Sequence, residues 1–152
     1  MIFRVATVED TKAIAAAIGA VVRGGEVFEF KSDLGGGKTA FVKGLARGMG
    51  VKNVVQSPSF TISFVHQAGD LELHHFDFYR LDEPGIVKAE LAESLEQPNA
   101  VVAIEWGQTV HDILPKNRLV SVTIKNAANS ARIITIDAPQ DYIKEALEYI
   151  KS

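Results

Sequence analysis

The chain contains no cysteine, and this absence removes whole classes of chemistry. Disulfide bonds, thiolate catalysis and cysteine-ligated zinc are all excluded. Basic residues are not in excess either, because 16 Lys and Arg stand against 19 Asp and Glu, for a formal net charge of −3 at pH 7. A protein that binds nucleic acid directly usually carries a basic domain or patch. Tight, sequence-independent binding of nucleic acid by this chain alone is therefore not expected.

Long hydrophobic runs are also missing. The longest apolar stretch, Ala13 to Val22, is rich in alanine and interrupted by Gly19, and it is far shorter than the roughly twenty residues that a membrane-spanning helix needs. The N-terminus leads to acidic Glu9 rather than to the basic and apolar regions of a secretion signal. We expect a cytoplasmic protein with no membrane partner.

What remains is an ordinary globular composition, with 152 residues of which 47% are hydrophobic and 23% charged. That length favours one domain, over residues 1–152. Turn signals at 68–70 and 126–130 predict two β-hairpins, and the alternation of strand and helix patterns predicts an α/β domain on a mixed sheet. The expected strands are 3–6, 27–31, 60–65, 71–78, 100–104, 119–124 and 132–136, and the expected helices are 7–22, 39–49, 84–97 and about 143–150.

A glycine-rich segment, Ser32-Asp33-Leu34-Gly35-Gly36-Gly37-Lys38-Thr39, lies between a predicted strand and a predicted helix. It follows the phosphate-binding loop pattern, except that Ser32 stands where the first glycine belongs. Such loops turn backbone N–H groups toward phosphates at the positive end of the next helix. Lys38 would reach the β- and γ-phosphates, and the Thr39 hydroxyl would ligate Mg²⁺. The alternative is a glycine-rich turn that begins a helix, with Lys38 in solvent.

A nucleotide site of this kind also needs an acidic residue near its metal ion. Glu105 follows the apolar run 100–104, so it should emerge at the end of a buried strand. Asp77 lies near the end of the strand 71–78. Each could also be a solvated carboxylate at a strand end, but a metal needs at least one of them, and Glu105 is favoured.

Three neighbours of these acids have less specific signals. His75 follows His74, and alternation along a strand places the two on opposite faces, where they cannot chelate one metal; His75 is expected to be a hydrogen-bonded, orienting residue. Arg80 could contact phosphate, but capping a helix or pairing at the surface is as consistent with its position. Trp106 follows Glu105 directly, and packing is slightly favoured for it over a ligand contact.

In combination, four segments resemble those of the bacterial TsaE (YjeE) family, the small ATPases of tRNA threonylcarbamoyladenosine biosynthesis. They are the glycine loop, Ser57-Pro58-Ser59-Phe60-Thr61, His75-Phe76-Asp77-Phe78-Tyr79-Arg80 and Ile104-Glu105-Trp106. Many nucleotide hydrolases share the first, but all four in one short chain are specific. The sequence departs from the family at Ser32, at Ala40 and Ser59 (each in place of Thr), and over 84–97.

The resemblance implies a single P-loop NTPase-like three-layer domain that hydrolyses ATP slowly by itself. It implies a partner, the TsaD–TsaB complex, whose turnover the ATPase supports and through which alone it meets tRNA. Asp77 and Lys38 would be catalytic, Thr39 and Glu105 would hold Mg²⁺, and 57–61 would be a nucleotide-sensing switch. ATP would be bound by Asp33, Leu34, Gly35, Gly36, Gly37, Lys38, Thr39, Ala40 and Trp106.

Three other functions share parts of this pattern. A small-molecule or nucleotide kinase needs an acceptor pocket and commonly an arginine-rich lid. A chain of 152 residues without an arginine cluster leaves little room for either. A GTPase needs the guanine-reading Asn-Lys-x-Asp motif, whereas Lys125-Asn126 has the reverse order and lacks the Asp. A non-hydrolytic interaction module with a degenerate loop is made conceivable by Ser32. The combined motifs favour the ATPase over all three.

Overall fold

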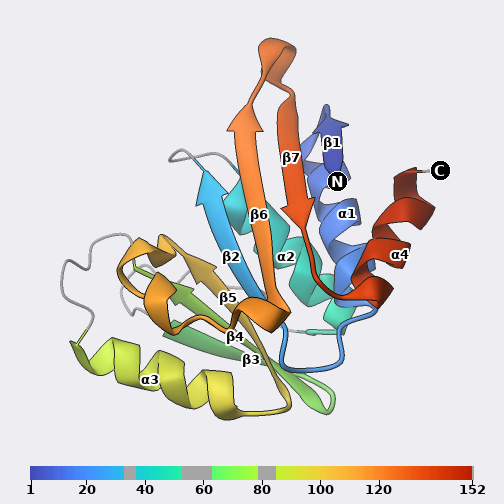
Figure 1. The fold of residues 1–152 in the computed structure, drawn as a ribbon. Helices are drawn as coiled ribbons and strands as arrows, with labels where there is room; N and C mark the ends of the chain where they lie inside the picture. The colour runs from blue at the N-terminus through green and yellow to red at the C-terminus, as the bar shows by residue number, and fades with distance from the viewer. Residues whose placement is uncertain (33–36, 53–62, 79–84, 152) are drawn as a thin grey trace.

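The computed structural model describes residues 1–32, 37–52, 63–78 and 85–151. In this part of the chain seven strands form one mixed sheet, in the order β1-β7-β6-β2-β5-β4-β3, and four α-helices pack against it (Figure 1). The α/β class, the mixed sheet and the hairpins β3–β4 and β6–β7 were all predicted and are confirmed. The strands are β1 (Ile2–Val5), β2 (Val27–Ser32), β3 (Ser63–Ala68), β4 (Leu71–Asp77), β5 (Ala100–Glu105), β6 (Leu119–Asn126) and β7 (Arg132–Asp137), and the helices are α1 (Val8–Gly19), α2 (Lys38–Met49), α3 (Gly85–Glu96) and α4 (Asp141–Lys151).

The four central strands, β6, β2, β5 and β4, run parallel to one another. In their register Phe30 of β2 lies opposite Glu105 of β5, and Glu105 lies opposite Asp77 of β4. Parallel strands end at the same edge of a sheet, and ligands of open α/β sheets bind outside that edge. The two predicted acidic residues are therefore side by side at the edge where a ligand is expected.

Hydrophobic clusters cover both faces of the sheet, which makes it the middle of three layers. One cluster joins the sheet to α1, α2 and α4 through residues such as Ile18, Phe41 and Ile143. The other joins it to α3 and includes Leu91 and Ile104. Because β5 is buried on both faces, its sequence is an unbroken apolar run before Glu105. Among the described helices, none has the length and apolar character that crossing a bilayer requires.

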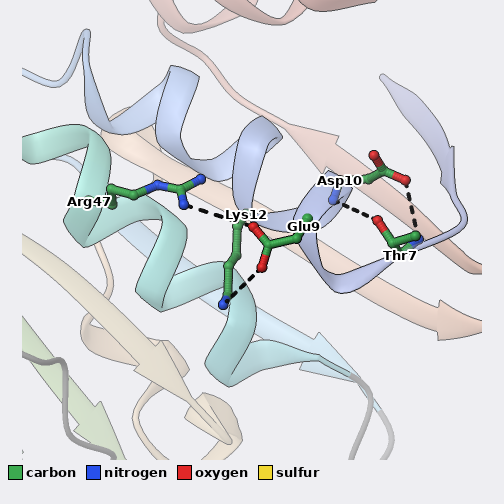
Figure 2. Close-up of polar contacts among 5 residues, drawn as sticks. All are labelled: Thr7, Glu9, Asp10, Lys12 and Arg47. Carbon is green, nitrogen blue, oxygen red and sulfur yellow. Dashed lines mark hydrogen bonds and ion pairs between the residues drawn. The ribbon is translucent and has the colours of Figure 1, made fainter.

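Helix α1 begins with side chains that cap its own N-terminus (Figure 2). The Asp10 amide donates to Thr7 Oγ1 at 3.1 Å, and the Thr7 amide donates to Asp10 Oδ2 at 3.2 Å. This capping box makes Thr7 the N-cap of α1, which agrees with the start of the expected helix 7–22. Figure 2 also shows two ion pairs of Glu9, one with Lys12 of the same helix and one with Arg47 of α2. These ion pairs are largely exposed, so each contributes at most about 1 kcal/mol.

Glycines allow α1 and α2 to approach one another closely. A Cβ atom at Gly48 would lie 2.0 Å from the Ala16 carbonyl oxygen, and one at Gly44 would lie 2.5 Å from the Lys12 carbonyl oxygen. Real Cβ atoms do not come so near to backbone, so any side chain at either position would push the helices apart. The contact fixes α2, whose N-terminus follows β2 at the carboxyl edge of the sheet.

Replacing Gly48 with alanine is expected to destabilise the protein. Helix propensity alone predicts a gain of about 1 kcal/mol for this change, whereas overpacking a close contact costs about 1–3 kcal/mol. Because the clash is with backbone, we expect the steric cost to prevail and the free energy of unfolding, measured in urea, to fall. Gly69→Asn is the control, since Gly69 has a φ of +63° and nothing within 4 Å of its Cβ position. A Gly48→Ala protein as stable as the parent would contradict the close packing.

Candidate functional site

The N-terminus of α2 is built differently from that of α1. Its N-cap is Gly37, with a φ of +106°, and it has neither a side-chain cap nor an acidic residue in its first turn. A φ in this region is readily adopted only by glycine. The first N–H groups of a helix have no partner within it, and they form the positive end of its dipole. Because α2 has neither a capping side chain nor an acidic residue in its first turn, this end suits an anion.

Lys38, the first residue of α2, is buried although it is a lysine. Only 7% of it is exposed, and its Nζ lies 3.8 Å from the centre of the Trp106 ring. Burial lowers the pKa of Lys38, while the nearby charges of Glu105 and Asp77 oppose that shift. The ammonium group thus lies within electrostatic reach of both carboxylates. A cation–π contact adds about 0.5–2 kcal/mol, depending on desolvation.

Glu105 and Asp77 are the last residues of two adjacent parallel strands. Glu105 is buried and Asp77 is half-buried. The sequence placed both at strand ends, which is confirmed, but it gave no sign that the two strands are neighbours. Their pairing brings two carboxylates to one place beside the α2 N-terminus.

His75 and His74 point to opposite faces of β4, as alternation predicted. His75 is fully buried, and its Nε2 lies 2.5 Å from Glu105 Oε2. His74 instead bonds Ser94 of α3 through Nδ1 at 2.7 Å and Glu72 through Nε2 at 3.0 Å. The prediction that His75 is hydrogen-bonded is confirmed, and its partner is the carboxylate favoured as a metal ligand.

Trp106 has a left-handed backbone conformation, with φ of +58° and ψ of +48°. Such a conformation is costly for a residue other than glycine, and strain of this kind clusters at functional sites. The turn that follows runs over Glu29, which is buried in β2; a Cβ at Gly107 would lie 3.0 Å from Glu29 Oε2. The same oxygen bonds His111 Nδ1 at 2.9 Å. Glu29 and His111 thereby fix the turn that carries Trp106, a role that sequence reasoning missed.

A cavity of about 460 Å³ opens beside Lys38, within the size range of ligand pockets. Sequence reasoning identified Lys38 and Trp106 but missed the wall formed by β6. That wall was hidden because the sequence does not reveal that β6 lies next to β2. The cavity is lined by, among others, Ser32, Lys38, Trp106, Gln108, Lys125 and Asn126.

Several predicted site residues fall outside the described part of the chain. They are Asp33, Leu34, Gly35 and Gly36 of the glycine loop, the segment 57–61, and Arg80. Their roles stay predictions. Thr39 and Ala40 are described, and both are half-buried in the first turn of α2.

The oxygen donors at this site fit magnesium better than a transition metal. Thr39 offers a hydroxyl, and Glu105 and Asp77 offer carboxylates. In the described part of the chain no three His, Cys, Asp or Glu side chains are grouped so that they could hold a metal by themselves. Mg²⁺ does not need such a cage, since it is usually bound by one or two carboxylates together with substrate phosphates and water.

Comparison with known proteins identifies relatives over almost the whole chain. The family model described as "Threonylcarbamoyl adenosine biosynthesis protein TsaE" matches residues 5–134. A relative in Bacillus subtilis, named tRNA threonylcarbamoyladenosine biosynthesis protein TsaE, is 36% identical over 90% of this chain and 84% of its own. The protein of the same name in Treponema pallidum is 34% identical over 84% and 93%. The crystal structure of YdiB from Bacillus subtilis superposes with a TM-score of 0.78 and 31% identity, covering 99% of this chain and 93% of that one.

The charge balance around Lys38 can be tested directly. Glu105→Gln and Asp77→Asn each remove a negative charge that raises the pKa of Lys38, so we expect that pKa to fall further below its ordinary value in either variant. The measurement is a pH titration of the lysine side-chain ¹³Cε resonances. Glu9→Gln, on the exposed side of α1, is the control and should leave the titration of Lys38 unchanged. An unaltered Lys38 titration in both site variants would contradict the arrangement.

Proposed function

The chain belongs to the TsaE family, and from this premise we propose that it is an ATP-binding and ATP-hydrolysing component of tRNA threonylcarbamoyladenosine biosynthesis. Residues 1–152 form one P-loop ATPase domain in this proposal. Its partner is a TsaD–TsaB-like complex, whose turnover ATP hydrolysis supports, and tRNA is met only through that complex.

One observation carries the nucleotide part of the proposal. The α2 N-terminus has no side-chain cap, and its first residue, Lys38, is buried beside two carboxylates at the carboxyl edge of parallel strands. Such an arrangement suits a polyphosphate, which supplies the anion for the helix and the lysine. The adjoining cavity offers about 460 Å³ for the rest of the nucleotide.

Thr39 and Glu105 would hold Mg²⁺, which, when bound, neutralises charge on the β- and γ-phosphates. Lys38 would exchange its contact with the Trp106 ring for the phosphate oxygens, where its charge stabilises the transition state. Asp77 would orient the attacking water. The water oxygen would bond to the γ-phosphorus as the bond to the β,γ-bridging oxygen breaks; that oxygen keeps the electron pair and leaves on ADP, and the two protons of the water leave with the phosphate.

The positions of the described arginines are an argument that the isolated protein hydrolyses ATP slowly. An arginine supplied by a partner raises the rate of related enzymes by about 10³–10⁵-fold. The five described arginines all make contacts elsewhere, and Arg80 lies outside the described residues. Arg4 contacts Ala128, Arg23 lies over Tyr142, Arg47 pairs with Glu9, Arg118 bonds Gly25 and Leu95, and Arg132 bonds Ser130. We therefore propose that the partner complex stimulates the activity.

Phosphate release from Mg·ATP tests the catalytic assignment. Asp77→Asn is expected to lower the turnover number by about a hundredfold or more, because it removes the group that orients water, while ATP binding is retained. Asp112→Asn is the matched control, since Asp112 is exposed and forms an ion pair with Lys88 of α3. Equal rates for the Asp77 variant and the native protein would remove Asp77 from the mechanism.

The pathway is tested by tRNA nucleoside mass spectrometry. Bacteria depleted of their own TsaE protein would carry either this chain or its Asp77→Ala variant, together with the TsaD and TsaB proteins that belong with this chain. We expect threonylcarbamoyladenosine to return with the native chain and not with the variant. Failure of the native chain to restore the nucleoside would refute the pathway assignment.

A further inference from the structure

His75 and Glu105 form a buried pair between the neighbouring strands β4 and β5, and Glu105 ends β5 at the ligand edge of the sheet. His75 has no exposed surface, and Glu105 is 4% exposed. His75 Nε2 and Glu105 Oε2 are 2.5 Å apart. As a metal ligand Glu105 would be ionised, and an ionised carboxylate can only accept a hydrogen bond, so in that state Nε2 carries the proton and donates it.

Within the described residues, this is the one hydrogen bond that the His75 side chain makes. Its other nitrogen, Nδ1, is buried without a hydrogen-bond partner there. His74 differs, because its two nitrogens tie β4 to Ser94 of α3 and to Glu72. Among the described residues the His75 side chain bonds no helix, and its hydrogen bond is to one carboxylate oxygen of Glu105.

Stability gives little reason for such a pair. Burying a polar pair costs desolvation, and apolar side chains of similar volume often give a protein that is as stable or more stable. The bond has one clear consequence for Glu105: with Oε2 held, the carboxylate cannot rotate freely, and Oε1 has a defined direction. Outer partners of metal ligands act in this way in many sites.

We propose that His75 is a positioning residue that orients the Glu105 carboxylate for Mg²⁺. This inference rests on the proposed function, in which Glu105 ligates the metal. It assigns to the buried imidazole no contact with nucleotide or with water. His75 would affect the affinity for the metal, and it would act through its Nε2–H group.

Two amide substitutions test whether the N–H group itself is needed, or whether any polar side chain at position 75 is enough. A glutamine amide can place its N–H near the position of His Nε2, whereas an asparagine amide reaches only that of Nδ1. His75→Gln should therefore retain the bond to Glu105, and His75→Asn should lose it. His74→Asn is the matched control, because it alters a buried histidine of the same strand on the opposite face.

The probe is Mn²⁺ in the presence of ADP, with free Mn²⁺ counted by electron paramagnetic resonance, and folding is checked by thermal denaturation. For His75→Asn we expect the Mn²⁺ dissociation constant to rise about 10–100-fold, as is typical when an outer partner of a ligand is removed. His75→Gln should remain near the native value. His74→Asn should lower the melting temperature without changing Mn²⁺ affinity.

Three results would overturn the inference while leaving the proposed function intact. They are native affinity in His75→Asn, equal loss in the glutamine and asparagine variants, and equal loss in the two asparagine variants at 74 and 75. A native protein that takes up no Mn²⁺ with ADP would instead overturn the metal assignment of Glu105, and the inference with it.

Discussion

The parallel pairing of β5 with β2 on one side and β4 on the other is the constraint on which the site depends. It places Glu105 opposite Phe30 and Asp77. A shift of β5 by one residue would turn Glu105 to the other face of the sheet, because side chains alternate along a strand. The apolar residues 100–104 are buried on both faces and oppose such a shift. Hydrophobic packing of one strand thus determines where the charges of the site lie.

Those charges are held in an environment that does not favour them individually. Lys38, Glu105 and His75 are all buried, and burial lowers the pKa of Lys38 although the charges of Glu105 and Asp77 oppose that shift. The remainder of the domain supplies the stability that this arrangement requires. Two hydrophobic clusters and the close contact of α1 with α2 provide it. The core and the site share residues, because Phe30 and Ile124 of one cluster line the cavity and Trp106 packs against the other.

Local features of this fold could be predicted from the sequence, whereas contacts between distant segments could not. Side-chain periodicity located the strands and helices, and Thr7 marked a helix start because capping joins residues only three positions apart. The opposite directions of His74 and His75 followed from alternation alone. The bond from His75 to Glu105 spans 30 positions, and it depends on β4 lying next to β5. No local pattern encodes that neighbourhood.

The same distinction explains what was found and missed at the site. Lys38 and Thr39 belong to a motif read within eight residues, and Glu105 and Asp77 stand at the ends of recognisable strands. The cavity wall from β6 and the support of the Trp106 turn by Glu29 arise only from sheet order. Membership of the TsaE family adds evidence that no single motif supplies, because the match extends over residues 5–134.

The contact between Lys38 and Trp106 has an optical consequence. Trp106 is the only tryptophan of the chain, and its ring lies against the ammonium group that a phosphate would attract. The indole emission of the protein therefore comes from one place, the edge of the proposed nucleotide site. Movement of Lys38 away from the ring changes the field around that single fluorophore. Binding of a nucleotide at the proposed site would therefore be visible in the emission of Trp106 without any added label.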